Sequence, residues 1–114
     1  MELYNHKTLE GKSYIQIQDE AIQVLQDIYD PEIPVNIYDL GLIYEVNVSL
    51  VSDIEVVMTL TSPSCPVAES LPAEVEQRLK GIEGVGLVTI QLTFEPPWDM
   101  EMMSEAAKLE LGML

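Results

Sequence analysis

Cysteine is almost absent from this chain. Its 114 residues include one cysteine, Cys65, and one histidine, His6. A lone cysteine excludes an internal disulfide, so nothing in the sequence indicates an oxidising compartment. Long apolar runs are lacking too: none approaches the ~20 residues of a membrane span, and residues 1–7 lack the pattern of a signal peptide. We therefore expect a cytoplasmic protein that does not bind membranes.

Positive charge is scarce as well. Five Lys and Arg residues stand against twenty Asp and Glu residues, which gives a formal net charge of −15. Such a surface repels phosphate groups, so it disfavours nucleic acids and anionic membranes as partners. The acidic excess serves either solubility alone or attraction to basic patches on partner proteins.

The chain does contain enough apolar material for one domain. Hydrophobic residues make up 47% of it, with six glycines and seven prolines, which is typical of a globular protein. Residues 1–14 show no clear period and are expected to form a flexible lead. A single domain is expected over residues 15–114.

Apolar periodicity predicts the first elements of that domain. A helical stripe begins at Ile17 and ends before Pro31, because the residue before a proline is pushed out of the helical region. Residues 31–41 follow as an extended loop. Alternating apolar residues predict two strands, at 44–50 and 54–61, and the short gap between them requires an antiparallel hairpin.

The second half of the chain predicts a helix, a strand and a helix. Helical spacing returns from Val67 to Ile82, where Pro72 either kinks the helix or marks the start of its regular part. Residues 88–94 alternate as a third strand, and a strand–helix–strand connection implies parallel pairing. The order is α-β-β-α-β-α, an α/β (α+β) two-layer sandwich with a three-stranded mixed sheet covered by helices.

The last predicted helix begins with Asp99 as its N-cap and ends near Gly112. Its apolar residues fall on two faces. We expect one face to meet the sheet and the other to meet a partner or a second copy in a homodimer, although a fully buried helix would show the same pattern. Trp98, just before this helix, either anchors a partner or covers an edge of the core.

Cys65 follows a predicted strand and a Ser/Pro turn, and it precedes a helix. Free N–H groups at a helix start favour a thiolate, but by only about 0.3–1 kcal/mol. Strong activation as a nucleophile needs a cationic or basic neighbour, and the sequence places none nearby. A metal ion deprotonates its own thiol ligand without such a neighbour. The residues alone leave a nucleophile, a metal or cluster ligand and a packed core cysteine as alternatives.

Three sequence blocks, taken in order, resemble one known family. They are residues 30–43 (DPEIPVNIYDLGLI), residues 58–66 (MTLTSPSCP) and residues 96–112, which open with Pro-Pro-Trp. The chain resembles the metal–sulfur cluster biosynthetic family typified by SufT, whose domain also occurs in PaaD and in Mrp-type proteins. It has neither a cysteine-rich C-terminal tail, as in PaaD-like proteins, nor a P-loop, as in Mrp-type proteins. It is therefore most similar to SufT-like single-domain members.

The resemblance implies an accessory role in iron–sulfur cluster assembly, cluster transfer or iron–sulfur protein maturation, and not an enzyme. Cys65 matches the motif cysteine and is the implied metal ligand, while Asp39 matches the aspartate of the family's Asp-Leu-Gly motif. Clusters usually take four thiolates, so a single cysteine cannot hold one alone. Iron or a cluster is therefore expected to bind only transiently, with ligands completed by a client or assembly protein or by a second copy.

The remaining candidates each have a structural alternative. Asp39 lies near Cys65 as an acceptor or ligand, or it only caps the backbone N–H at Gly41. Thr59 and Thr61 share a face of the second strand, where they either line the pocket of Cys65 or are ordinary strand residues. Two other functions stay open: a thiol- or metal-dependent enzyme that uses Cys65 with Asp39, and an interaction module in which the cysteine is inert.

Overall fold

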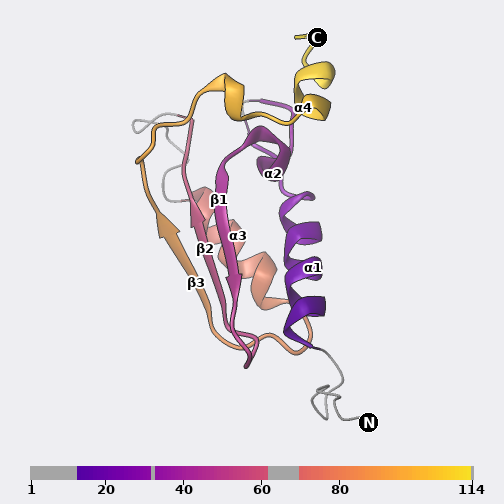
Figure 1. Cartoon of the computed structure of the whole chain (residues 1–114), viewed down its shortest axis with the longest axis vertical. Coiled ribbons are helices and arrows are strands. Elements are labelled where there is room, and N and C mark those ends of the chain that lie inside the picture. Colours follow the sequence, from indigo (N-terminus) through magenta and orange to yellow (C-terminus); the bar gives the residue numbers. More distant parts are fainter. Residues whose placement is uncertain (1–12, 32, 62–69, 114) are drawn as a thin grey trace.

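The computed structural model describes residues 13–31, 33–61 and 70–113, and Cys65 lies outside these ranges. The elements follow one another along the chain as shown in Figure 1. They are α1 (Tyr14–Leu25), α2 (Ile37–Leu40), β1 (Ile43–Val48), β2 (Ile54–Met58), α3 (Ser70–Lys80), β3 (Val88–Leu92), the 3₁₀-helix η1 (Met100–Met102) and α4 (Glu105–Glu110).

The sheet has the predicted mixed pairing. β1 pairs antiparallel with β2, β2 pairs parallel with β3, and the strand order is β1-β2-β3. The hairpin between β1 and β2 and the crossover through α3 are therefore both confirmed. So is the α/β class with its three-stranded mixed sheet.

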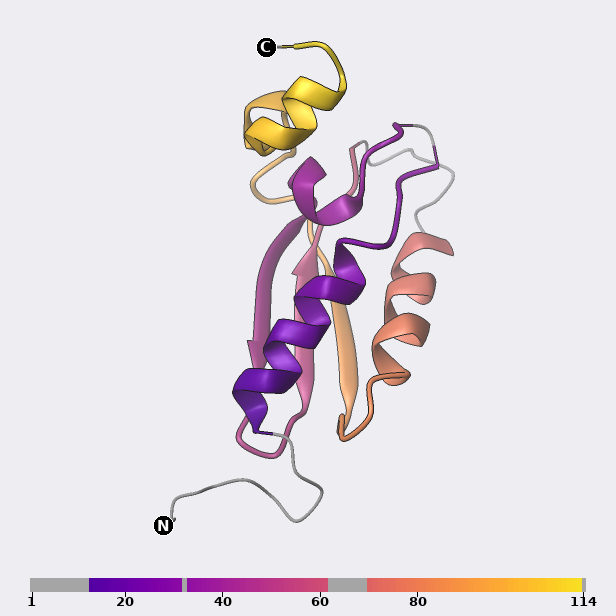
Figure 2. The same cartoon turned by 90° about the vertical axis from the view of Figure 1, so that its right-hand side faces the viewer.

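Helices α1 and α3 cover the same face of the sheet, so the domain has two layers (Figures 1 and 2). The buried residues between the layers repeat with helical spacing on the helices and with a period of two on the central strand. They are Ile17, Ala21 and Leu25 of α1, Leu71, Val75 and Leu79 of α3, and Ile54, Val56 and Met58 of β2. The opposite face of the sheet, which includes Glu55 and Val57, has no helical layer over it among the described residues.

Local sequence explains where the two long helices begin. Ser13 and Gln16 form a capping box: the Gln16 backbone N–H donates to Ser13 Oγ at 3.2 Å, and the Ser13 N–H donates to Gln16 Oε1 at 3.0 Å. Pro72 lies in the first turn of α3, where a backbone N–H has no partner within the helix, so it does not kink the helix.

Several predicted boundaries differ from the structure, including the ends of β1 at Val48 and β3 at Leu92, short of the predicted residues 50 and 94. α1 begins at Tyr14, within the predicted lead, and ends at Leu25, because the chain then turns and Tyr29 forms a bridge with Asn36. The predicted extended loop contains the short helix α2. β2 ends at Met58, three residues before Thr61.

The predicted last helix is divided into two pieces. Asp99 caps only η1, because its side chain accepts from the Glu101 N–H at 2.7 Å. Met103 is extended, and Ser104 then caps α4 by accepting from the Ala107 N–H at 3.1 Å. Among the helices described, each is too short or too polar to span a bilayer.

Candidate functional site

Cys65, the predicted metal ligand, lies outside the described residues. The structure therefore describes the candidate site through the other motif residues. These are the first sequence block, the residues of the second block up to Thr61, and the third block. The residues of these blocks meet at the end of the sheet where β2 finishes and β1 begins (Figure 1).

The Asp-Leu-Gly motif is bonded to the third block through its backbone. The Ser104 N–H donates to the Asp39 carbonyl oxygen at 2.8 Å, and the indole N–H of Trp98 donates to the Leu40 carbonyl oxygen at 2.8 Å. Trp98 is also partly buried against the core, which confirms that it covers a core edge. Two segments about sixty residues apart in sequence are thus held together at successive residues.

Gly41 is required at the third position of this motif. Its φ of +90° lies in the left-handed region that favours glycine, where it ends α2. A Cβ at this position would lie 2.5 Å from the Met102 carbonyl oxygen, which is too close for any side chain. The motif glycine therefore lets the third block pack directly against the end of α2.

The Asp39 side chain is occupied by the N-cap of α2. Asn36 Oδ1 accepts from the Asp39 N–H at 2.8 Å, and Asn36 Nδ2 donates to Asp39 Oδ2 at 2.8 Å. This reciprocal pair satisfies a free donor at the helix start. The predicted structural alternative, in which Asp39 caps Gly41, is wrong, because the Gly41 N–H donates to the carbonyls of Ile37 and Tyr38.

Thr59 links the second block to the first. Its backbone N–H donates to the Leu42 carbonyl oxygen at 2.8 Å, and its side chain is fully buried. Thr61 is half-buried in a bend beyond the strand. Asp39 is hydrogen-bonded to Asn36 and Ser104, and within the described residues no hydrogen bond joins Asp39 to either threonine.

Tyr44 is a site residue that the sequence does not reveal. Its alternation with Val46 and Val48 predicts the apolar row, but a bulge between Ile43 and Glu45 turns it away from the core. The Tyr44 hydroxyl donates to the Pro96 carbonyl oxygen at 2.7 Å. Nothing in the apolar pattern marks a one-residue bulge, so this position could not be found by periodicity.

Burial raises the pKa of the Tyr44 phenol. A hydrogen bond with the Thr59 side chain opposes this shift, and the negative charge of Asp99 adds to it. The phenol also lies 3.7 Å from the sulfur of Met102. Tyr44, which directly follows the first block, therefore contacts the second block through Thr59 and the third block through Pro96 and Met102.

Tyr44 forms one wall of a cleft on the open face of the sheet. The cleft has a volume of about 910 Å³ and contains the carboxylates Glu45, Glu55 and Glu95 in its lining. Asp39 lies instead against a small cavity of about 110 Å³ between α2 and α4. The two hollows share no lining residue, so the structure does not bring Asp39 into the cleft.

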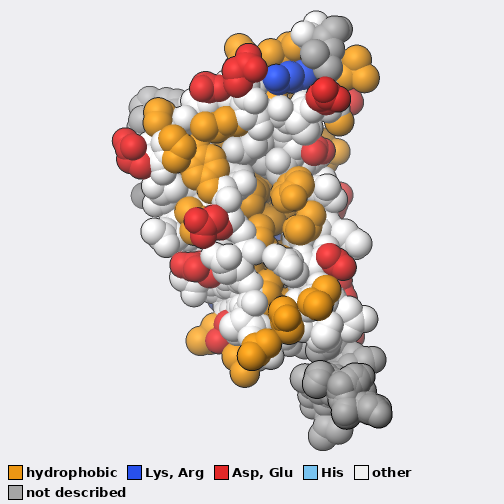
Figure 3. All heavy atoms as spheres, viewed as in Figure 1, with side chains coloured by type: hydrophobic (Ala, Val, Ile, Leu, Met, Phe, Trp, Pro, Cys, Tyr) orange, Lys and Arg blue, Asp and Glu red, His pale blue; other side chains and the backbone are white. Residues whose placement is uncertain are grey.

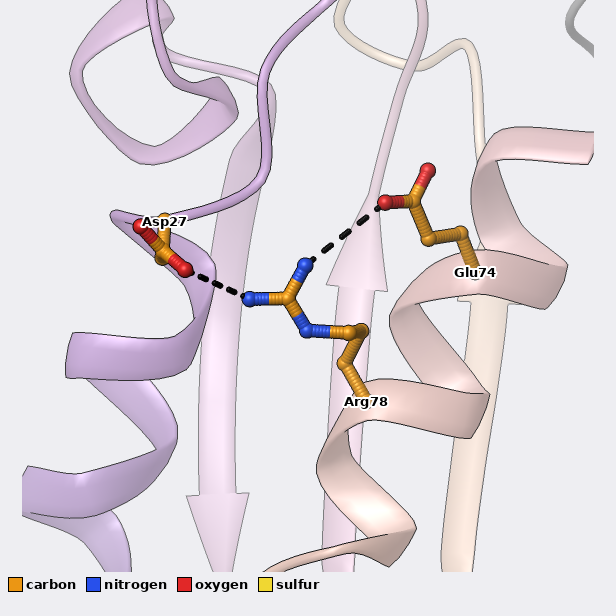
Figure 4. A network of polar contacts seen from close by, with 3 residues as sticks. All are labelled: Asp27, Glu74 and Arg78. Carbon is orange, nitrogen blue, oxygen red and sulfur yellow. Dashed lines mark hydrogen bonds and ion pairs between the residues drawn. The ribbon is translucent and has the colours of Figure 1, made fainter.

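The acidic charge is not balanced on this surface. Figure 3 shows Asp and Glu side chains spread over the visible face, with the clearest Lys and Arg patch near α4. Each Lys and Arg within the described ranges already has an acidic partner. The pairs are Arg78 with Asp27 at 2.7 Å and Glu74 at 3.7 Å (Figure 4), Lys80 with Glu76 at 2.9 Å, and Lys108 with Glu101 at 3.3 Å.

Within residues 13–31, 33–61 and 70–113, no group of three or more His, Cys, Asp and Glu side chains is arranged to hold a metal ion. The described site offers backbone hydrogen bonds between the blocks, one half-buried phenol and an acidic cleft. The protein is thus a small, acidic, two-layer α/β domain whose motif blocks interlock at one end of the sheet.

Comparison with known families gives this class a name. A family model described as "Iron-sulfur cluster assembly protein" matches residues 18–108. The chain belongs to this family of iron–sulfur cluster assembly proteins. The family resemblance predicted from the three sequence blocks is therefore confirmed.

Curated relatives cover nearly the whole chain. A protein of Porphyromonas gingivalis named Fe-S protein maturation auxiliary factor is 48% identical over 91% of this chain and 99% of its own length. The Staphylococcus aureus factor SufT is 37% identical over 75% of this chain and 98% of its own length. These names agree with the accessory role in iron–sulfur protein maturation that the sequence predicts.

Solved structures show the same fold. A domain of unknown function, DUF59, from Bacillus anthracis matches with a TM-score of 0.79 and 31% identity over 86% of this chain and 93% of that chain. A conserved hypothetical protein from Thermotoga maritima matches with a TM-score of 0.72 and 34% identity over 83% and 93% of the two chains.

Proposed function

We propose that this protein is an auxiliary factor in the maturation of iron–sulfur proteins, which takes iron or a cluster transiently on Cys65 and passes it to a client or assembly protein. One observation carries the proposal. The described residues of the three family blocks are bonded to one another through Leu42 with Thr59, Leu40 with Trp98 and Asp39 with Ser104. The residues that define the family thus form one unit at the end of β2, from which the chain continues towards Cys65.

A single thiolate ligand favours transient binding and transfer of iron or a cluster over a stably held cluster. Thiolate sulfur is a preferred ligand of iron–sulfur clusters, but a cluster usually takes four such ligands. Cys65 supplies one, so the client, an assembly protein or a second copy supplies the others. The iron or cluster is then cargo that exchanges between proteins. Asp39, Thr59 and Thr61 are proposed as neighbours of this cargo rather than as a complete ligand set.

The place and partners of the protein follow from the same chemistry. A free thiol that hands over iron needs a reducing compartment, which supports a cytoplasmic location. The net charge of −15 supports partners with basic surfaces. Whether two copies share one cluster stays a prediction, and light scattering with and without reconstituted iron and sulfide tests it.

The function is tested in cells that lack the protein. We expect the activity of an iron–sulfur enzyme such as aconitase to fall in these cells, and to be restored by the wild-type chain but not by Cys65→Ser. Gln23→Ala, at an exposed position of α1, serves as the matched control and should restore activity fully. Unchanged aconitase activity in the deletion strain would overturn the maturation role. Full rescue by Cys65→Ser would overturn the role of the cysteine alone.

A second experiment separates the negative charge of Asp39 from its hydrogen bond to Asn36, the N-cap of α2. Asp39→Asn keeps a side-chain oxygen that can accept from Asn36 but removes the charge, whereas Asp39→Ala removes both. If Asp39 assists the cargo, Asp39→Asn should lower the rescue of aconitase activity while the unfolding midpoint stays unchanged. If it only holds the capping side chain of Asn36 in place, Asp39→Asn should rescue fully, and Asp39→Ala should lose about 1 kcal/mol of stability, the net contribution of one hydrogen bond.

A further inference from the structure

We propose that the outer edge of β3 is a docking site for an extended, positively charged segment of a partner protein, which joins the sheet as a fourth strand. This surface differs from the proposed Cys65 site, and the inference does not depend on iron chemistry.

The hydrogen bonds to β2 fix which groups of β3 face outward. The Ile54 N–H donates to the Leu87 carbonyl oxygen at 2.7 Å, and the Thr93 N–H donates to the Met58 carbonyl oxygen at 2.9 Å. In a parallel ladder with this register, alternate residues of one strand make all the bonds to its neighbour. The backbone groups of the residues between Leu87 and Thr93 can therefore be assigned.

Thr89 and Gln91 direct their backbone groups to β2. Val88, Ile90 and Leu92 consequently direct their N–H and C=O groups away from the sheet. β3 is the last strand in the sheet order, and no other strand within the described residues pairs with it. Such a row of outward backbone groups is a template for an added strand.

The opposite edge of the sheet has protective features that β3 lacks within the described part of the chain. β1 carries a bulge between Ile43 and Glu45, a charged residue in Glu45, and a contact in which Gln18 Nε2 donates to the Val46 carbonyl oxygen at 3.1 Å. Bulges, charges and covering groups are the devices that block edge pairing. The sequence of β3, Val88–Leu92, contains no charged residue and no proline, and its register with β2 is regular.

The side chains of β3 suit an added strand on both faces. Ile90 and Leu92 pack against the core but are only partly buried, so a neighbouring strand would remove more of their apolar surface from water. Thr89 and Gln91 are exposed on the open face and carry no charge that would repel a partner. Backbone bonds and apolar contact would thus act together.

The acidic residues around β3 favour a positively charged partner segment. Glu55 lies opposite Thr89 in the β2–β3 register, Glu83 precedes the strand and Glu95 follows it. A lysine- or arginine-rich segment would meet these carboxylates favourably. A second copy of this chain would bring the same acidic groups and a charge of −15, so pairing between two β3 edges is opposed by repulsion.

The test uses a short synthetic peptide of alternating lysine and valine with blocked ends. We expect it to bind the full chain and to slow hydrogen exchange at the Val88, Ile90 and Leu92 amides by at least about tenfold, without comparable protection at β1. The matched glutamate–valine peptide should bind at least about tenfold more weakly. A lysine–valine peptide N-methylated at two adjacent central residues loses a donor on each edge, and it should also bind at least about tenfold more weakly.

Substitutions in β3 test the same proposal by changing the protein instead of the peptide. Ile90→Pro removes an outward N–H but no bond to β2, and it should abolish peptide binding, while Gln91→Ala should leave binding unchanged. If Ile90→Pro does not fold, the N-methylated peptide still decides the question. Equal binding of the methylated peptide, or protection only outside β3, would overturn the proposal. Protection of the three amides that rises with protein concentration and without peptide would assign the edge to a second copy instead.

Discussion

Gly41 satisfies two separate requirements with one residue. Its backbone lies in the left-handed region, and its missing Cβ leaves room for the backbone of Met102. The first requirement ends α2, and the second lets the third motif block approach the first. The glycine of the Asp-Leu-Gly motif therefore has a structural explanation that is independent of any cargo.

Replacing each of two glycines with alanine separates the cost of a left-handed backbone from the cost of the contact with Met102. Gly112 also has a positive φ, of +75°, but a Cβ there would meet nothing within 4 Å. Gly112→Ala should cost about 1 kcal/mol of unfolding free energy, the usual penalty for a left-handed alanine. Gly41→Ala should cost about 2–4 kcal/mol, because the Met102 backbone must also move. Urea unfolding measures both variants, and equal losses would show that the contact with Met102 is unimportant.

Tyr44 gives the protein a pH dependence in the alkaline range. Because burial raises the pKa of its phenol in the folded state, the unfolded chain releases this proton first as the pH rises. The contribution is present below the ordinary tyrosine pKa of about 10 and is lost as the pH rises towards the folded pKa. Stability should therefore fall in this window.

Tyr44→Phe should make the free energy of unfolding less dependent on pH above about pH 10, since it removes the shifted group. Below this pH the variant should be less stable than the wild type, because the bond to Pro96 is lost. Tyr29→Phe, at an exposed position, is the control. Urea titrations at several pH values measure the slope, and an unchanged slope in Tyr44→Phe would contradict this assignment.

At the scale of elements, the apolar pattern predicted the helices and strands that are long enough to show a repeat. α1 and α3 each bury one stripe, and β2 alternates strictly between buried Ile54, Val56 and Met58 and the open face. These patterns arise from burial against one core, so the sequence carries them directly. The mixed sheet followed because a short gap and a helical crossover each allow one direction of pairing.

Short elements and tertiary contacts were not predictable in the same way. α2 has four residues, too few for a helical period, and its only local signals are Asn36 as a cap and Gly41 as a stop. The break at Met103 depends on the Ser104 N–H reaching Asp39, a contact between distant segments. Cys65 stood out as the one thiol of the chain, and the family motif added Asp39 and favoured a ligand role for the cysteine, whereas Tyr44 depends on a bulge that leaves no mark in the apolar pattern.

The connection between α2 and the third block can be weakened by removing one hydrogen-bond donor, the indole N–H of Trp98. Trp98→Phe keeps an aromatic ring against the core but leaves the Leu40 carbonyl oxygen without its donor, at a cost of about 1–2 kcal/mol. Hydrogen exchange should become faster at Gly41 and Leu42. Ser104→Ala is the comparison, because it removes the cap of α4 and should loosen α4 first. Identical exchange patterns in the two variants would contradict separate ties.

At the scale of the whole molecule, five Lys and Arg residues compensate only a small part of the negative charge of twenty Asp and Glu residues. The described cations are already paired, and these pairs are exposed: the side chain of Arg78 is 38% exposed and that of Asp27 is 76% exposed. Exposed pairs contribute little to stability. The remaining carboxylates repel one another, and this repulsion is larger in the folded domain than in the expanded unfolded chain.

Salt should therefore stabilise this protein. Raising sodium chloride from about 10 mM to about 0.5 M shortens the screening length from about 30 Å to less than 10 Å, so repulsion among distant carboxylates largely disappears. We expect the free energy of unfolding to rise by about 1 kcal/mol, which is about 4 °C in the thermal midpoint for a domain of this size. Potassium chloride at the same ionic strength should act equally, since screening does not depend on the ion. A fall in the midpoint with either salt would mean that attractive pairs such as Arg78 with Asp27 outweigh the repulsion, and Arg78→Gln would then remove the effect.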